Sequence, residues 1–78
     1  MGNEIYMSVT ITDFGNGEVR CIFSESINDE PIRLSYIDIN KAHKLMWELV
    51  LAGGKRSVSV SSLDRDIVTS NAYIFLPN

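Results

Sequence analysis

Residues 38–54 read DINKAHKLMWELVLAGG, and no other stretch of the 78-residue chain spaces its apolar residues with the period of a helix. One side of a helical wheel holds Ile39, Ala42, His43, Met46, Leu49 and Val50. Ser35 and Asp38 can each cap the first N–H groups, and Gly53-Gly54 can end the helix because glycine adopts the left-handed conformation. The sequence therefore predicts one amphipathic helix that covers one face of a sheet.

The segments around this helix alternate apolar and polar residues, as strands do. Predicted strands cover residues 4–12, 18–24, 56–62 and 67–76, with a shorter extended piece at 32–34. Between them we expect a hairpin turn at 13–17, a loop or second turn at 25–31, a turn at 63–66 and a bend in the last strand at 70–71. The predicted fold class is α+β, a small antiparallel β-sheet of four to five strands packed on one α-helix. Its order is two strands, the short third strand, the helix and two more strands.

The length and composition indicate a single domain over residues 1–78 with one thin core. Its one cysteine, Cys21, cannot form an internal disulfide, and this favours a reducing, cytoplasmic setting. We expect no signal peptide and no membrane segment, because no apolar run approaches the length that either requires. The net charge of −3 disfavours binding to phosphate backbones through the overall field.

One short motif and two single residues could indicate a chemical function, but a structural role explains each of them better. Gly53-Gly54-Lys55 contains the Gly-Lys pair of a phosphate loop, but that loop follows a strand and opens a helix, whereas here the order is reversed. His43 has no orienting carboxylate or nucleophile in the sequence pattern, and we interpret it as a half-buried packing residue. Cys21 alternates with core residues and is expected to be a small hydrophobe.

The remaining polar cluster is Asp64-Arg65-Asp66, which we interpret as a turn because it lacks the oxygen-rich loop of a calcium site. One histidine and one cysteine give zinc no ligand set. The sequence therefore predicts no cofactor, no metal and no enzymatic activity.

The predicted sheet has one face under the helix and one open face. Assigned to the helix side are Ile5, Met7, Val9, Val19, Cys21, Phe23, Val58 and Val60. The open face then carries Tyr6, Ser8, Thr10, Arg20, Ile22, Ser57 and Ser59, joined by either Tyr73 with Phe75 or Ala72 with Ile74. Hydroxyls mixed with aromatic residues are typical of protein contact surfaces, and they are equally typical of a solvated sheet face.

Two classes of function follow, of which the first is a small non-enzymatic protein-interaction module. The candidate interaction residues are Tyr6, Arg20, Glu25, Asp29, Glu30, Trp47, Asp64, Asp66, Tyr73 and Phe75. In length, acidity and element order the chain resembles small phage-encoded or mobile-element inhibitors of host complexes, including anti-CRISPR proteins. This resemblance is one of format, without a shared motif. It implies that carboxylates would meet a basic partner surface that otherwise receives nucleic acid.

The second class is nucleic-acid binding through the sheet, with aromatic residues stacking on bases and Arg20, Lys55 and Arg56 meeting phosphates. The acidic composition counts against it. A role as a structural or oligomerisation subunit is a further alternative. Homodimerisation is predicted from the thin core and from Leu45, Trp47 and Leu51 at the border of the apolar stripe.

Overall fold

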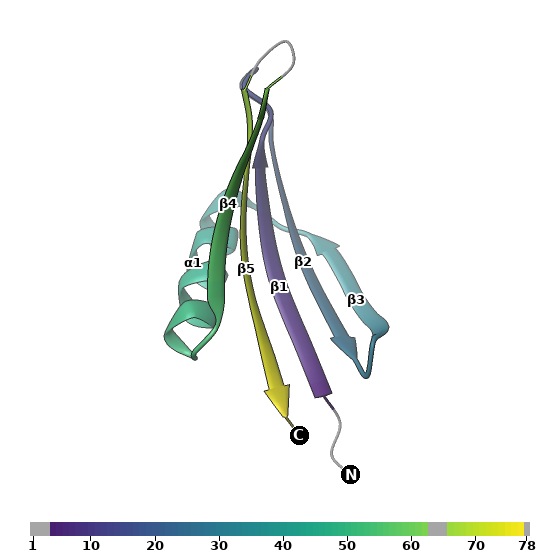
Figure 1. Ribbon diagram of the computed structural model, residues 1–78. Helices are drawn as coiled ribbons and strands as arrows, with labels where there is room; N and C mark the ends of the chain where they lie inside the picture. Colours follow the sequence, from purple (N-terminus) through teal and green to yellow (C-terminus); the bar gives the residue numbers. More distant parts are fainter. Residues whose placement is uncertain (1–3, 63–65, 78) are drawn as a thin grey trace.

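The computed structural model describes residues 4–62 and 66–77, which form five strands and one helix (Figure 1). In chain order they are β1 (Glu4–Asp13), β2 (Val19–Ile27), β3 (Glu30–Tyr36), α1 (Ile39–Leu51), β4 (Lys55–Ser62) and β5 (Asp66–Pro77). The predicted α+β class and element order are confirmed. The turn predicted at 63–66 lies mostly outside the described residues, and Asp66 is the first residue of β5 rather than part of a turn.

The five strands form one antiparallel sheet in the order β3-β2-β1-β5-β4. Because each neighbouring pair is antiparallel, the two edge strands β3 and β4 run in the same direction. A tight turn cannot join two such strands. Helix α1 makes this connection, carrying the chain from one edge of the sheet to the other across a single face (Figure 1).

Both predicted ends of the helix are confirmed by hydrogen bonds. The Asp38 carboxylate accepts from the backbone N–H of Lys41 at 2.9 Å and caps the first turn. At the other end Gly53 has a φ of 102°, and the N–H of Gly54 donates to the carbonyl of Leu49 at 2.8 Å. The following Lys55 opens a strand, so the Gly-Lys pair has the polarity opposite to that of a phosphate loop.

Of the two alternatives predicted for residues 25–31, the second turn is confirmed and the loop is wrong, because β2 and β3 continue into this segment as a tight hairpin. Only Asn28 and Asp29 form the turn, and both have positive φ values, 51° and 66°, as a two-residue type I′ turn requires. The Asn28 side chain also accepts from the backbone N–H of Glu4 at 2.9 Å. Because the turn is this short, β3 is seven residues long, whereas the predicted extended piece had three.

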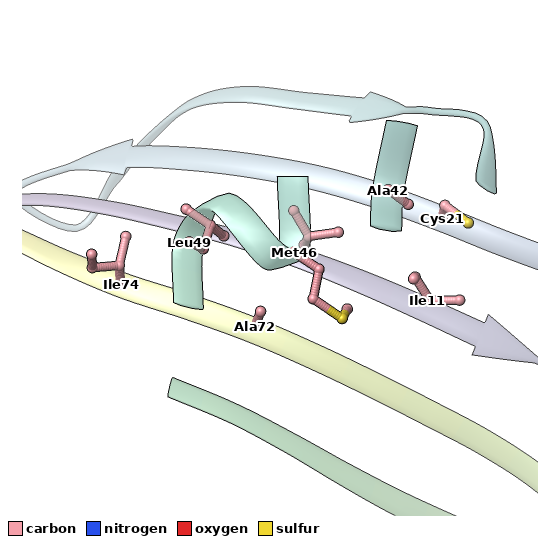
Figure 2. Close-up of a cluster of buried hydrophobic side chains, with 8 residues drawn as sticks. Ile11, Cys21, Ala42, Met46, Leu49, Ala72 and Ile74 are labelled. Carbon is pink, nitrogen blue, oxygen red and sulfur yellow. The ribbon is translucent and has the colours of Figure 1, made fainter. Parts of the chain in front are cut away.

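The core lies between α1 and the sheet (Figure 2). Its buried apolar members are Val9, Ile11, Cys21, Ala42, Met46, Leu49, Ala72 and Ile74. Cys21 is therefore the buried hydrophobe that the alternation predicted. Since Ala72 and Ile74 belong to the core, the alternation of β5 places Tyr73 and Phe75 on the open face. The choice that the sequence left open is thereby settled.

Helix α1 covers only part of the sheet face beneath it. A helix of 13 residues is about 20 Å long, whereas a strand of 12 residues extends about 40 Å. The sheet accordingly runs well past the helix in Figure 1. Val19 and Val60, level with Asp13, lie beyond its reach, and Val58, although level with the buried Ile11, lies on the uncovered edge strand β4. Val58 and Val60 are 57% and 62% exposed. The prediction that these valines pack under the helix is wrong for this reason.

Other local expectations were also wrong. His43 is exposed rather than half-buried, and Ile39 is exposed despite its place on the apolar side of the wheel. Strand β5 keeps its pairing register on both sides of Ser70-Asn71, so the polar pair does not interrupt the strand, and the bend expected there stays a prediction. Within residues 4–62 and 66–77, no helix is long and apolar enough to cross a membrane.

Candidate interaction surface

Three aromatic side chains gather at one end of the open face, on the two central strands. Tyr6 of β1 lies directly opposite Phe75 of β5, with ring centroids 4.8 Å apart and an interplanar angle of 47°. Tyr73 lies two residues earlier on β5, and its centroid is 6.1 Å from each of the other two. These separations are typical of favourable aromatic pairs. We call Tyr6, Tyr73 and Phe75 the aromatic cluster.

The polar residues beside the cluster form hydrogen bonds with one another and with the backbone. The Ser8 and Ser24 hydroxyls share a hydrogen bond of 2.7 Å between β1 and β2, and Ser8 is buried although it is on the open face. Asn71 donates to the Thr10 hydroxyl at 2.9 Å and to the Val9 carbonyl at 3.3 Å. Among the described residues no buried side-chain polar atom lacks a hydrogen bond. These polar side chains therefore have a structural role, whereas the exposed apolar side chains of this face, Phe75 of the aromatic cluster and Leu34 and Tyr36 of β3, are not buried by folding.

The surface is hollowed on both sides of the cluster. A hollow of about 480 Å³ lies between the aromatic side chains and the β2–β3 hairpin, lined by Tyr6, Ser24, Glu25, Ser26, Asp29, Pro31, Arg33, Leu34 and Phe75. A smaller one of about 200 Å³ adjoins it at Glu4, Asn28 and Asp29. A third, of about 300 Å³, lies beside Tyr73 and Lys55. Phe75, which is 54% exposed, borders all three.

Carboxylates predominate around the first two hollows. Glu4 and Asp29 border them beside Tyr6 and Phe75, whereas Glu25 and its partner Arg33 alternate toward the helix side of the sheet together with Met7. Asp29 borders both hollows because it occupies the tip of the β2–β3 turn. Lys55, which lines the third hollow, is directly opposite Tyr73. The end of the face that includes Tyr6 is therefore acidic, and a single lysine lies near Tyr73.

The structure brings half of the sequence-predicted interaction residues together. Tyr6, Glu25, Asp29, Tyr73 and Phe75 surround the hollows, and Glu30 adjoins Asp29 in the chain.

The other predicted residues lie elsewhere. Arg20 is opposite Thr12, six residues or about 20 Å along β1 from Tyr6, where it pairs with Glu18 at 3.0 Å and lies 5.2 Å from the centre of the Phe14 ring. Trp47 is on α1, Asp66 is nine residues from Phe75 along β5, and Asp64 lies outside the described residues.

Sequence reasoning missed the wall that β3 contributes to the hollow of about 480 Å³. Pro31, Arg33 and Leu34 belong to this wall, together with Ser24 and Ser26 of β2. Ser26 and Pro31 were missed because residues 25–31 were interpreted as a loop or turn. Ser24, Arg33 and Leu34 were predicted to be extended, but the pairing of β3 with β2 that makes them one wall was not predicted. The available signal was Asn28-Asp29, since both residue types tolerate the positive φ of a two-residue hairpin turn. A register shift between Glu25 and Ser26 bends this hairpin beside the hollow.

Cys21 does not belong to this surface, and we expect it to be unreactive in the folded protein. It is 5% exposed, and burial, followed by the Asp38 carboxylate, raises the pKa of its thiol. Since the thiolate is the nucleophile, a disulfide reagent at pH 8 should modify the folded chain at least about tenfold more slowly than the urea-unfolded chain. Equal rates in the two states would contradict the buried position.

Comparison of the chain with protein-family models, curated proteins and solved structures finds no match. Within the described part of the chain, no group of three or more histidine, cysteine, aspartate or glutamate side chains is placed to hold a metal ion. Inference about function therefore rests on the surface geometry alone.

Proposed function

We propose that this protein is a small non-enzymatic interaction module that binds a partner protein through the aromatic cluster. The observation that supports this most directly is the position of Phe75. It is 54% exposed, contacts the two other rings and borders three hollows. Exposed aromatic residues beside a concave surface are enriched in protein interfaces, where they anchor binding.

Covering the cluster would provide binding energy that folding does not use. The core is formed on the opposite side of the sheet, so Tyr6, Tyr73 and Phe75 contribute little to it. Aromatic side chains bury large areas, and each Å² of apolar surface removed from water contributes about 25 cal/mol. Their mutual contacts also restrict the rings before binding, which lowers the entropic cost.

The charges around the cluster favour a partner segment that presents an arginine or lysine. A cation above the ring of Tyr6 or Phe75 would gain a cation–π interaction, and Asp29 and Glu4 could accept its hydrogen bonds. Arginine fits better, because its planar guanidinium can stack on a ring and pair with a carboxylate at once. A basic partner surface is also what the resemblance to phage-type inhibitors implies.

A titration with a defined peptide tests the proposal. Acetyl-Gly-Arg-Gly-amide should shift the amide NMR signals of Tyr6, Phe75, Asp29 and Leu34, with a dissociation constant of about millimolar size for so small a ligand. The matched peptide with citrulline, which has nearly the same shape and no charge, should bind at least about tenfold more weakly. Equal shifts with both peptides would contradict a cation site.

A pair of variants locates the binding. Phe75→Ala should abolish the arginine-dependent shifts, whereas Trp47→Ala should leave them unchanged. The two residues have similar exposure, 54% and 59%, but Trp47 is on the helix. If both variants bind like the original chain, the cluster is not the site.

Nucleic-acid binding is the competing function, because the same rings could stack on bases and Lys55 lies beside Tyr73. The carboxylates next to Tyr6 oppose a phosphate backbone, and Arg20 is about 20 Å away along β1. A fluorescent single-stranded oligonucleotide should therefore bind no better at low salt than at moderate salt. Tight, salt-sensitive binding would replace the proposed function with this alternative.

A further inference from the structure

The two edges of the sheet differ in how well they are protected from pairing with another strand. On β3, Pro31 lacks an N–H group, Glu30 and Arg33 are charged, and the pairing with β2 contains a register shift. All of these features hinder edge-to-edge association. On β4, residues 57–62 read SVSVSS, with no charge, no proline and no irregularity in the pairing with β5. The outer edge of β4 is therefore a template for a further strand.

The side chains of β4 add a reason for covering this edge. All eight residues of the strand are exposed, including Val58 and Val60 on the helix-side face, where α1 does not cover them. Alternating serine and valine have a period of two, so a partner strand must match its faces to those of β4. An identical strand in antiparallel orientation meets this requirement.

We propose that β4 pairs with β4 of a second copy of this chain, antiparallel and centred on Ser59. In this register Ser59 faces Ser59 of the second copy, and Val58 faces its Val60. Two-fold symmetry about an axis perpendicular to the sheet relates the copies, as is common in closed homodimers. The valines of both copies then become cross-strand neighbours and cover part of one another's apolar surface.

Charge complementarity supports the antiparallel orientation. Arg56 lies near the start of β4, and in this register it faces Ser62 of the second copy, near the end of that strand. Ser62 pairs on its other side with Asp66, and Arg56, Ser62 and Asp66 share the helix-side face of the sheet. A serine is small enough for the long arginine side chain to reach across it toward the carboxylate, a distance of about 10 Å between Cα atoms. The symmetry provides this pairing twice.

The dimer would contain one continuous sheet, formed from two five-stranded sheets. Because the axis is perpendicular to the sheet, both helices lie on one face and both aromatic clusters on the other. This inference is independent of the proposed function, since no cluster residue lies on β4. It also presents two copies of the cluster on the same side.

Charge-swap variants test the dimer and its register. Sedimentation equilibrium of the full chain at micromolar concentrations should give twice the 8.8 kDa monomer mass. Ser59→Lys and Ser59→Glu should each weaken dimerisation about tenfold or more, because each places like charges opposite one another at the centre of the pair. An equimolar mixture of the two variants should restore the dimer, now as a heterodimer.

Each other outcome overturns part of the proposal. A monomeric original chain would reject self-pairing and leave the edge of β4 for an unrelated strand. A dimer unaffected by the Ser59 variants would reject β4 as the interface, and variants that fail to associate when mixed would reject the register. Ile32→Lys on the opposite edge, where the side chain is also exposed, should leave the dimer intact. Circular dichroism checks that every variant is folded.

Discussion

Replacing Leu49 with alanine should lower the free energy of unfolding by about 2–4 kcal/mol. Leu49 is 7% exposed and lies between α1 and the sheet, among the buried residues of the core (Figure 2). Truncation removes apolar contacts and leaves a cavity that a thin core cannot fill by small adjustments. In a domain of this size the loss is a large part of the total stability.

Leu51→Ala is the matched control, since it makes the same chemical change two residues later in the same helix. Leu51 is 82% exposed, so its truncation should change stability by no more than about 0.5 kcal/mol. Urea unfolding of both variants, followed by circular dichroism at one protein concentration, measures the difference. Similar losses would mean that the helix does not present Leu49 to the core.

Replacing Gly54 with alanine should destabilise the protein by about 3 kcal/mol, the upper end of the usual cost of overpacking. A Cβ atom at this position would lie 2.6 Å from the Tyr73 carbonyl oxygen and 2.7 Å from the Leu49 carbonyl oxygen. Both obstacles are backbone atoms. The Leu49 carbonyl accepts the Gly54 N–H, and Tyr73 is in the sheet directly opposite Lys55, so neither atom can move without breaking local structure.

Gly53→Ala separates this close approach from ordinary helix-end strain. Gly53 has a φ of 102°, but a Cβ atom there would meet nothing within 4 Å. Its replacement should cost about 1 kcal/mol from backbone conformation alone. Thermal unfolding should therefore rank Gly54→Ala as the less stable variant. The reverse order would show that the approach of helix end and strand is not tight.

The elements that the sequence predicted correctly are those with local signals. Asp38 and Gly53-Gly54 lie at the helix ends because capping depends on residues within one turn. The alternation in residues 4–12 likewise sufficed to assign Val9 to the helix side of the sheet, where it is fully buried. The predictions failed where the structure depends on the length of an element or on its pairing with a distant strand. Residues 25–27 and 30–31 became strand because β1 and a two-residue turn offered them backbone partners.

The candidate surface depended still more on long-range pairing. Glu25, Asp29, Tyr6 and Phe75 were all selected from sequence, but nothing in their spacing indicated that they surround one hollow. The pairing of Tyr6 with both Ser26 and Phe75 brings them together, across separations of 20 and 69 positions. Leu34 and Arg33 were not selected, because their part in the surface follows from the length of β3.

By itself, the sequence determined one amphipathic helix, the periodicity of the strands and the acidic, single-cysteine composition, because these depend on neighbouring residues. The tertiary structure decided which face of β5 is buried, how far the helix reaches and which strands form the edges. These features depend on strand order and on the relative lengths of helix and strand. The placement of Ala72 and Ile74 in the core directs Tyr73 and Phe75 to the open face. The shortness of α1 leaves Val19 and Val60 uncovered, since 13 helical residues span about half the length of the longest strand.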